Sequence, residues 1–141
     1  MTRRWTMTLA VMVLTVVGAP TLRADDLTGA SRVLCTCVQA TRCVEGGDCT
    51  IDLPWNMNIP QFIEVDLVSK RMSTTPASGG NRATVADTLR REKGKIVLQG
   101  FENGRAFSLF IDEASGMLSA AVAADGQAVA VFGACTPMPS K

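Results

Sequence analysis

Residues 95–135 read KIVLQGFENGRAFSLFIDEASGMLSAAVAADGQAVAVFGAC, and this stretch decides the fold. It contains four apolar runs, and Asn103-Gly104 separates the first two. Asn-Gly between apolar runs is a strong hairpin signal, because a type I′ turn requires positive φ at both central residues. Turn sequences at residues 113–116 and 125–126 separate the remaining runs. Turns that recur about every 11 residues predict consecutive antiparallel strands.

The apolar residues within these runs alternate, which is typical of strands that turn one face to a core. Successive side chains of a strand point to opposite sides, so residues two apart share a face. The residues that this spacing places on inward faces are Phe107, Leu109 and Ile111, then Leu118, Ala120 and Val122, and finally Val129, Val131 and Cys135. Phe132, like Phe107, is also predicted to lie in the core.

Further strands are expected upstream, where the pattern is less regular. Residues 31–39, 62–68 and 84–91 each predict a strand, and residues 42–52 predict a hairpin around Gly46-Gly47. A continuous meander of this size usually closes, because closure removes the exposed strand edges. The predicted fold is therefore all-β. It is a small antiparallel meander closed into an up-and-down barrel of about eight strands, with a β-sandwich as the alternative.

The first 24 residues have the pattern of an export signal. Arg3 and Arg4 precede an apolar run at residues 7–17, and Ala24 precedes the predicted cleavage point. An apolar run of this length is too short to span a bilayer comfortably. Residues 1–24 are therefore predicted to be a signal peptide and residues 25–141 a single β domain. The mature protein is expected to be periplasmic or secreted, with no stable membrane span.

The composition excludes several classes of function. The chain has no histidine, which rules out Ser-His-Asp and Cys-His catalysis and histidine metal sites. Residues 1–24 contain three arginines and no acidic residue, so the formal net charge of +1 becomes −2 for residues 25–141. No strongly basic field remains, which argues against a nucleic-acid partner.

The cysteines are predicted to form disulfides, because an exported protein matures in an oxidising compartment. Cys43 and Cys49 flank the predicted hairpin turn and are expected to form the first bridge. The second bridge is expected to join Cys135 to Cys35 or Cys37, since the first and last strands become neighbours when a meander closes. Cys35 and Cys37 share one face and cannot both pair with Cys135, so the choice between them stays open here.

A metal site or a reactive thiol is the alternative use of these cysteines. Four thiolates between residues 35 and 49 are soft ligands that suit Cu(I) or zinc. The spacing lacks the paired C-x2-C knuckles of zinc sites, and Cys35-x-Cys37 is not the C-x-x-C of thiol redox proteins. No metal and no cofactor are therefore expected.

Three regions are candidate binding sites, and each also has a plain structural interpretation. Trp55 could anchor a binding surface, or it could cap the open end of the barrel. Ser78 and Asn81 lie in the longest predicted loop, which could enter a cleft of a partner or simply be flexible. Arg90 and Arg91 belong to a basic turn that could meet an acidic partner or a lipid head group, or could be a solvated hairpin end.

Several spaced motifs carry a resemblance that spans nearly the whole mature chain. They are Leu34-Cys35, Cys43-x5-Cys49, Pro60-x-Phe62, Gly104-Arg105-x-Phe107 and Phe132-Gly133-Ala134-Cys135. In these motifs the chain resembles an uncharacterised family of small exported proteobacterial proteins, and the resemblance implies no activity. Cys37 departs from the pattern of that family, so the resemblance implies that Cys37 is the free thiol.

The expected architecture is also similar, more loosely, to periplasmic inhibitors of c-type lysozymes, which are small disulfide-tied β-barrels. Those inhibitors carry a Ser-Gly-x-x-Tyr motif, whereas this chain has Ser78-Gly79 and no tyrosine. A shared architecture does not define a function.

The sequence therefore predicts a non-catalytic, inhibitor-like binding module of the cell envelope, whose partner is an envelope protein. The first alternative is a carrier of a small apolar ligand in the barrel lumen, where small inward residues such as Ala120 would leave space. The second alternative is a thiol- or metal-dependent envelope protein that uses the Cys35/Cys37 pair.

Overall fold

The strands predicted from residues 95–135 are all present. They are β7 (Lys95–Glu102), β8 (Arg105–Asp112), β9 (Met117–Ala124) and β10 (Gln127–Pro137), each antiparallel to the next. At the first turn Asn103 and Gly104 have φ values of 49° and 76°, the backbone that a type I′ turn requires. The computed structural model describes residues 25–139, so the predicted signal peptide lies outside the described residues.

The N-terminal half supplies the other strands and two short 3-10 helices. Their bounds are β1 (Arg32–Val44), β2 (Cys49–Asp52), η1 (Pro54–Met57), β3 (Phe62–Asp66), β4 (Arg71–Thr74), η2 (Pro76–Ser78), β5 (Ala83–Val85) and β6 (Thr88–Glu92). All strands belong to one antiparallel sheet, and residues 25–139 contain no α-helix. The all-β class is confirmed.

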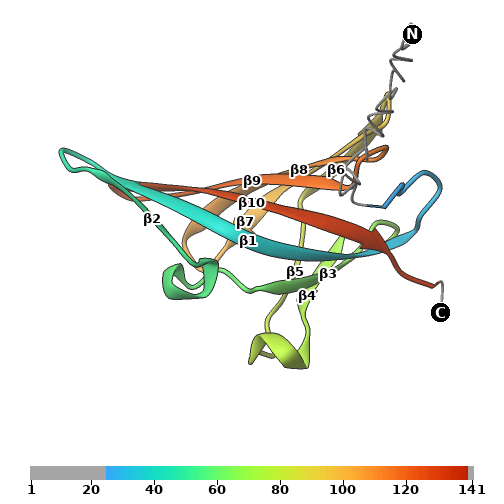
Figure 1. Ribbon diagram of the computed structural model, residues 1–141, viewed down its shortest axis with the longest axis horizontal. Coiled ribbons are helices and arrows are strands. Elements are labelled where there is room, and N and C mark those ends of the chain that lie inside the picture. The colour runs from blue at the N-terminus through green and yellow to red at the C-terminus, as the bar shows by residue number, and fades with distance from the viewer. Residues whose placement is uncertain (1–24, 140–141) are drawn as a thin grey trace, which may run out of the picture.

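The sheet is strongly curled into a half-barrel (Figure 1). Its strand order is β5-β4-β3-β1-β10-β9-β8-β7-β6, with β2 paired to the second half of β1. β5 and β6 lie at opposite edges, yet only Ala86 and Asp87 separate them in the chain. Figure 1 shows the resulting strong curvature.

Residues 83–92 act as one bent strand that connects the two edges of the sheet. Its first part, β5, pairs with β4, and its second part, β6, pairs with β7. Ala86 at the bend is buried, and its backbone N–H donates to the carbonyl oxygen of Lys70 at 2.9 Å. If the bent strand is counted once and β2 is left out, the ten strands of the sheet reduce to eight consecutive antiparallel strands, as predicted. They form one sheet and not the two packed sheets of a β-sandwich.

A β-bulge and a glycine allow β1 to follow β10 along its length. The register shifts between Cys37 and Gln39, which leaves Val38 as the extra residue of the bulge. A Cβ at Gly133 would lie 2.1 Å from the carbonyl oxygen of Thr36. Only glycine lets the two backbones approach so closely at the bulge.

The predicted inward faces of β8, β9 and β10 are confirmed, with one exception. Leu109, Leu118 and Val131 are buried, as the alternation requires. Phe132, however, points outward and is 45% exposed. Its prediction as a core residue was wrong, because it is out of phase with Val131 and the pleat of the strand outweighs the apolar character of one side chain.

Two cysteine pairs lie at disulfide distance, Cys35 with Cys135 and Cys43 with Cys49. In both pairs the cysteines are direct neighbours across antiparallel strands. The strand register also settles the choice that the sequence left open, because Cys35 lies opposite Cys135 whereas Cys37 lies opposite Gly133. Cys37 is free and buried.

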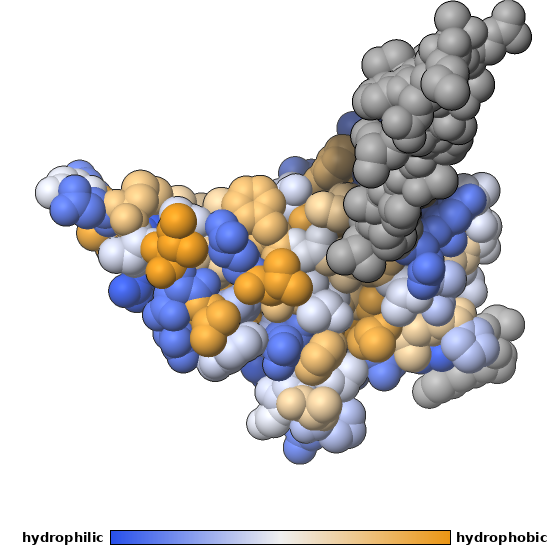
Figure 2. Space-filling model, in the orientation of Figure 1, coloured by the Kyte–Doolittle hydropathy of each residue, from blue (hydrophilic) through white to orange (hydrophobic). Residues whose placement is uncertain are grey.

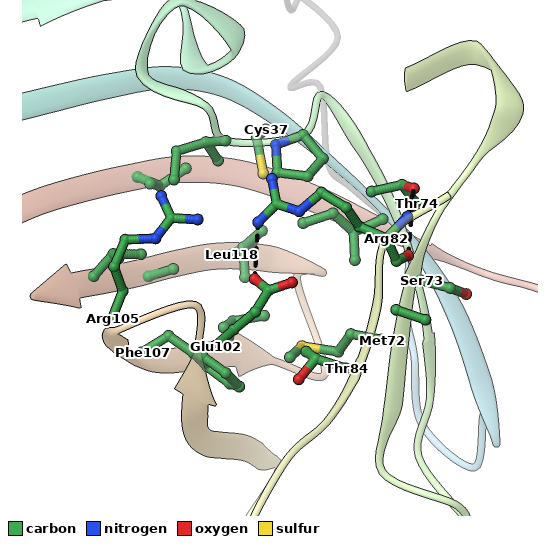
Figure 3. A pocket seen from close by; sticks show the side chains of 18 residues that line it. Cys37, Met72, Ser73, Thr74, Arg82, Thr84, Glu102, Arg105, Phe107 and Leu118 are labelled. Carbon is green, nitrogen blue, oxygen red and sulfur yellow. Dashed lines mark hydrogen bonds and ion pairs between the residues drawn. The ribbon is translucent and has the colours of Figure 1, made fainter. Parts of the chain in front are cut away.

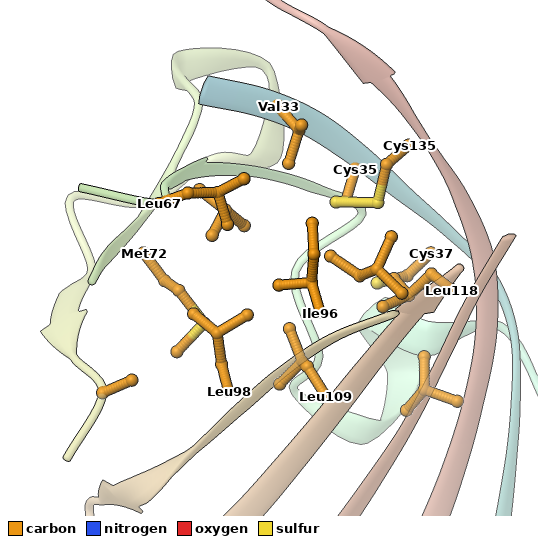
Figure 4. Packing of buried hydrophobic residues seen from close by; sticks show 14 of the residues in the cluster. Val33, Cys35, Cys37, Leu67, Met72, Ile96, Leu98, Leu109, Leu118 and Cys135 are labelled. Atoms are coloured by element: carbon orange, nitrogen blue, oxygen red, sulfur yellow. A yellow bond between two sulfur atoms is a disulfide. The ribbon is translucent and has the colours of Figure 1, made fainter. Parts of the chain in front are cut away.

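The N-terminal segment closes one end of the barrel. Leu27 is fully buried, and its backbone N–H donates to the carbonyl oxygen of Glu113 at 2.7 Å. Arg91 holds this segment from β6: Nη1 donates to the carbonyl oxygen of Ala30 at 2.9 Å, and Nε pairs with the Glu113 carboxylate. Leu27 joins the core cluster that includes Ile96, part of which is seen in Figure 4.

An ion pair near this closed end predicts a pH dependence of stability. The Asp112 carboxylate accepts hydrogen bonds from Lys95 Nζ and from the backbone N–H and hydroxyl of Ser115, and these bonds lower its pKa to about 2. A depressed folded-state pKa stabilises the fold above the unfolded value of 3.8, and this contribution is lost as the pH falls through about 2.

We therefore expect Asp112→Asn to lower the free energy of unfolding at pH 7 and to flatten its decline between about pH 4 and pH 2. Urea unfolding at a series of pH values measures both effects. Asp125→Asn, in an exposed turn, is the matched control and should follow the wild-type curve. Parallel curves for wild type and Asp112→Asn would contradict the assignment.

Candidate functional site

The interior of the curled sheet is not completely filled toward the end that carries η1 and η2. The cavity there is lined by largely apolar side chains, which include Ile63, Met72, Phe107, Leu109, Ala120 and Val131 (Figure 3). The volume of this cavity is about 90 Å³. An engineered apolar cavity of about 150 Å³ binds benzene, so this cavity has room for the end of an alkyl chain rather than for a large ring system.

Two small residues shape the interior of the sheet here. Ala120 on β9 faces the cavity where a larger side chain would fill it. Gly100 on β7 lies directly opposite Phe107 on β8, and a Cβ at Gly100 would lie 2.6 Å from Phe107 Cζ. The Phe107 ring therefore rests against the bare backbone of β7.

Charged side chains stand at the rim of the apolar cavity. Arg82 Nη2 lies 2.8 Å from Glu102 Oε2, and Arg82 Nη1 donates to the carbonyl oxygen of Asn58 at 3.1 Å. These contacts join the segment after η1 to β7 across the mouth of the cavity. Arg105, at the start of β8, lies beside them in Figure 3 without an ion pair of its own. Within residues 25–139, no carboxylate oxygen lies within 4.0 Å of its guanidinium nitrogens.

A wider and more polar cavity adjoins the apolar one beneath η1. Its volume is about 290 Å³. Arg105 and Val122 line both this cavity and the apolar one. The polar side chains that line it are Arg42, Asn56, Asn58, Arg105 and Gln127. No carboxylate lines it among the described residues. We call this space the vestibule.

Asp52 lies near the vestibule and partly balances its charge. Hydrogen bonds from the Leu53 backbone N–H and the Asn56 side chain lower the pKa of Asp52, and the charge of Arg42 adds a smaller effect in the same direction. Arg42 therefore has a carboxylate in its surroundings. Arg105 lies opposite Glu102 across the β7–β8 hairpin, but the Glu102 carboxylate pairs with Arg82 instead.

Two of the predicted binding regions lie at this open end. Trp55 lies on η1 and is 47% exposed, so it does not fill the barrel mouth as a buried cap would. Asn81 is exposed just before Arg82. Ser78 has a structural contact: its hydroxyl donates to the carbonyl oxygen of Phe62 at 3.0 Å and accepts from the Phe62 N–H at 2.7 Å. The loop of Ser78 is thereby tied to β3.

Arg90 and Arg91 lie at the other, closed end of the barrel. The side chain of Arg90 is 77% exposed, whereas Arg91 binds the segment that carries Leu27. The structure thus does not bring these arginines together with Trp55, Ser78 and Asn81.

Cys37 lines the apolar cavity, and its environment makes it a poor nucleophile. Burial raises the pKa of its thiol to about 11, so the thiol stays protonated at neutral pH, whereas the thiolate is the reactive form. Residues 25–139 also contain no group of three or more cysteine, aspartate or glutamate side chains placed to hold a metal ion. These observations give no support to the thiol- or metal-dependent alternative.

The sequence patterns did not predict a site role for Arg82, Glu102 or Arg105. A usable signal was present for Arg105, because it shares the parity of Phe107 and Leu109 and therefore faces inward with them. Arg82 had no such signal, since its placement depends on the long-range contact with Glu102.

The described residues include no helix that is long and apolar enough to cross a membrane. The two cysteine pairs are compatible with an extracellular or periplasmic protein. Comparisons of the chain with models of protein families, with curated proteins and with solved structures find no match.

Proposed function

We propose that this chain is a non-catalytic binding module of the cell envelope that takes the apolar part of a small ligand into its barrel lumen. The observation that carries the proposal is the apolar cavity beside Ala120, which adjoins the polar vestibule at one end. The other end is closed by Leu27 and the Arg91–Glu113 pair. A chain-like ligand would therefore enter tail first and leave its polar end in the vestibule.

Filling the lumen tests the proposal. We expect Ala120→Leu to abolish binding of 1-octanol, because the added side chain occupies the space that the alkyl chain would take. The matched control is Ala121→Leu, which makes the same change on the exposed outer face of the same strand. Isothermal titration calorimetry on the wild type and both variants measures the affinity, and thermal unfolding confirms that each variant is folded.

Two results would contradict the proposal. One is a wild-type protein that binds neither 1-octanol nor other small alkyl ligands. The other is binding that Ala120→Leu and Ala121→Leu weaken equally, because that would place the ligand outside the lumen.

A protein partner at the same end is the second candidate. It is favoured by three exposed apolar side chains that follow one another along β2 and η1: Ile51 at 71%, Leu53 at 45% and Trp55 at 47% exposure. Figure 2 shows several exposed apolar side chains, set among hydrophilic ones, on the face that is viewed. Ala120→Leu should not change binding to this outer surface. The same two variants therefore distinguish a protein partner from a ligand in the lumen.

A further inference from the structure

We infer that the ligand of the lumen is an amphipathic anion, with a short alkyl chain in the apolar cavity and a carboxylate bound by Arg105. This inference rests on the proposed function and names the chemical class of the ligand. Its basis is the position of Arg105, which is the charged residue shared by the apolar cavity and the vestibule.

The charges around the opening favour an anion. Arg42, Arg82 and Arg105 stand there with Asp52 and Glu102, which leaves one positive charge in excess. Glu102 is engaged by Arg82 at 2.8 Å, and Asp52 lies near Arg42. Arg105 likewise has no carboxylate within ion-pair distance among residues 25–139, since its cross-strand neighbour Glu102 is taken up by Arg82.

A carboxylate suits this position by geometry as well as by charge. A guanidinium presents parallel N–H donors that match the two oxygens of a carboxylate. Arg105 is half-buried, so its charge is screened less than it would be in bulk water. Its attraction to a carboxylate is therefore stronger. The side-chain amides of Asn56, Asn58 and Gln127 add further hydrogen-bond donors in the vestibule.

The dimensions set the length of the alkyl chain. The apolar cavity, with a volume of about 90 Å³, accommodates a few methylene groups. The wider vestibule would hold the rest of the alkyl chain together with the head group. A saturated carboxylate of medium chain length fits this division, so octanoate is the appropriate probe.

The experiment compares three probes that share an eight-carbon chain and differ in charge at pH 7: octanoate, 1-octanol and octylammonium. Calorimetry is performed on wild type, Arg105→Gln, Arg105→Lys and the control Arg90→Gln, which removes an exposed arginine at the closed end. We expect wild type to bind octanoate most tightly. Arg105→Gln should weaken octanoate about tenfold or more, leave 1-octanol nearly unchanged, and thereby also show that the variant is folded.

The controls make the result specific. Arg105→Lys keeps the charge and should retain part of the preference for octanoate, whereas Arg90→Gln should retain all of it. If 1-octanol binds but octanoate shows no preference, or if Arg105→Gln leaves the preference intact, the inference is wrong and the lumen function stands. If octylammonium binds as tightly as octanoate, the charge argument is wrong. If no probe binds, the proposed function fails and the inference fails with it.

Discussion

Replacing Cys35 and Cys135 together with alanine is expected to lower the free energy of unfolding by about 4–5 kcal/mol. The pair joins residues separated by 100 positions, and the loop-entropy estimate for a ring of this length is about 4.7 kcal/mol. Much of the typical stability of a small domain, about 5–15 kcal/mol, would then be lost. Urea unfolding of the oxidised protein measures the loss, in a Cys37→Ala background that prevents exchange between the free thiol and the disulfides.

The second disulfide supplies the matched control. Cys43 and Cys49 are separated by 6 positions, so replacing both with alanine should lower the free energy of unfolding by only about 2 kcal/mol. The two double variants remove the same atoms and differ in the length of chain that the bridge closes. Equal losses, or a larger loss for Cys43 and Cys49, would show that the long ring does not hold the first and last strands together as argued.

The parts of the fold that sequence reasoning predicted well are those that short-range chemistry determines. The hairpin at Asn103-Gly104 is an example, because positive φ at both positions is a local requirement. The Cys43–Cys49 pair follows in the same way from the turn between them. The order of the strands around the sheet was predicted less directly, because it relied on the general tendency of a long meander to close.

The parts that it missed depend on how distant strands meet. The bulge at Val38 and the close approach at Gly133 exist only because β1 and β10 run together over their whole length. Likewise the bend at Ala86 arises because one strand must pair first with β4 and then with β7. Neither feature has a signature in the residues around it.

The candidate site shows the same division. Loop composition drew attention to the segments of Trp55 and Asn81, which lie at the open end. Arg91 also drew attention because of the charges around it, yet its guanidinium is engaged with the N-terminal segment. Charge along a sequence does not distinguish an arginine that binds its own chain from one that faces a cavity, as Arg105 does.

Truncating Leu27 to alanine is expected to lower the free energy of unfolding by about 3–5 kcal/mol, the range found when a buried leucine is replaced and a cavity remains. Leu27 lies before the first strand, in a segment with no regular secondary structure, yet its side chain is fully buried. Its backbone is held on both sides, by the carbonyl oxygen of Glu113 and by the guanidinium of Arg91. The segment therefore cannot move inward easily to fill the space.

The matched control is Leu53→Ala, the same truncation at a leucine that is 45% exposed, where the loss should be below about 1 kcal/mol. Urea unfolding of both variants gives the comparison. A loss as small for Leu27→Ala as for Leu53→Ala would mean that residues before β1 are only loosely attached. In that case the barrel would be open at both ends, and the entry of a ligand from the vestibule alone would lose its structural basis. A large and selective loss would instead establish that the N-terminal segment is part of the core and that the lumen is closed beneath it.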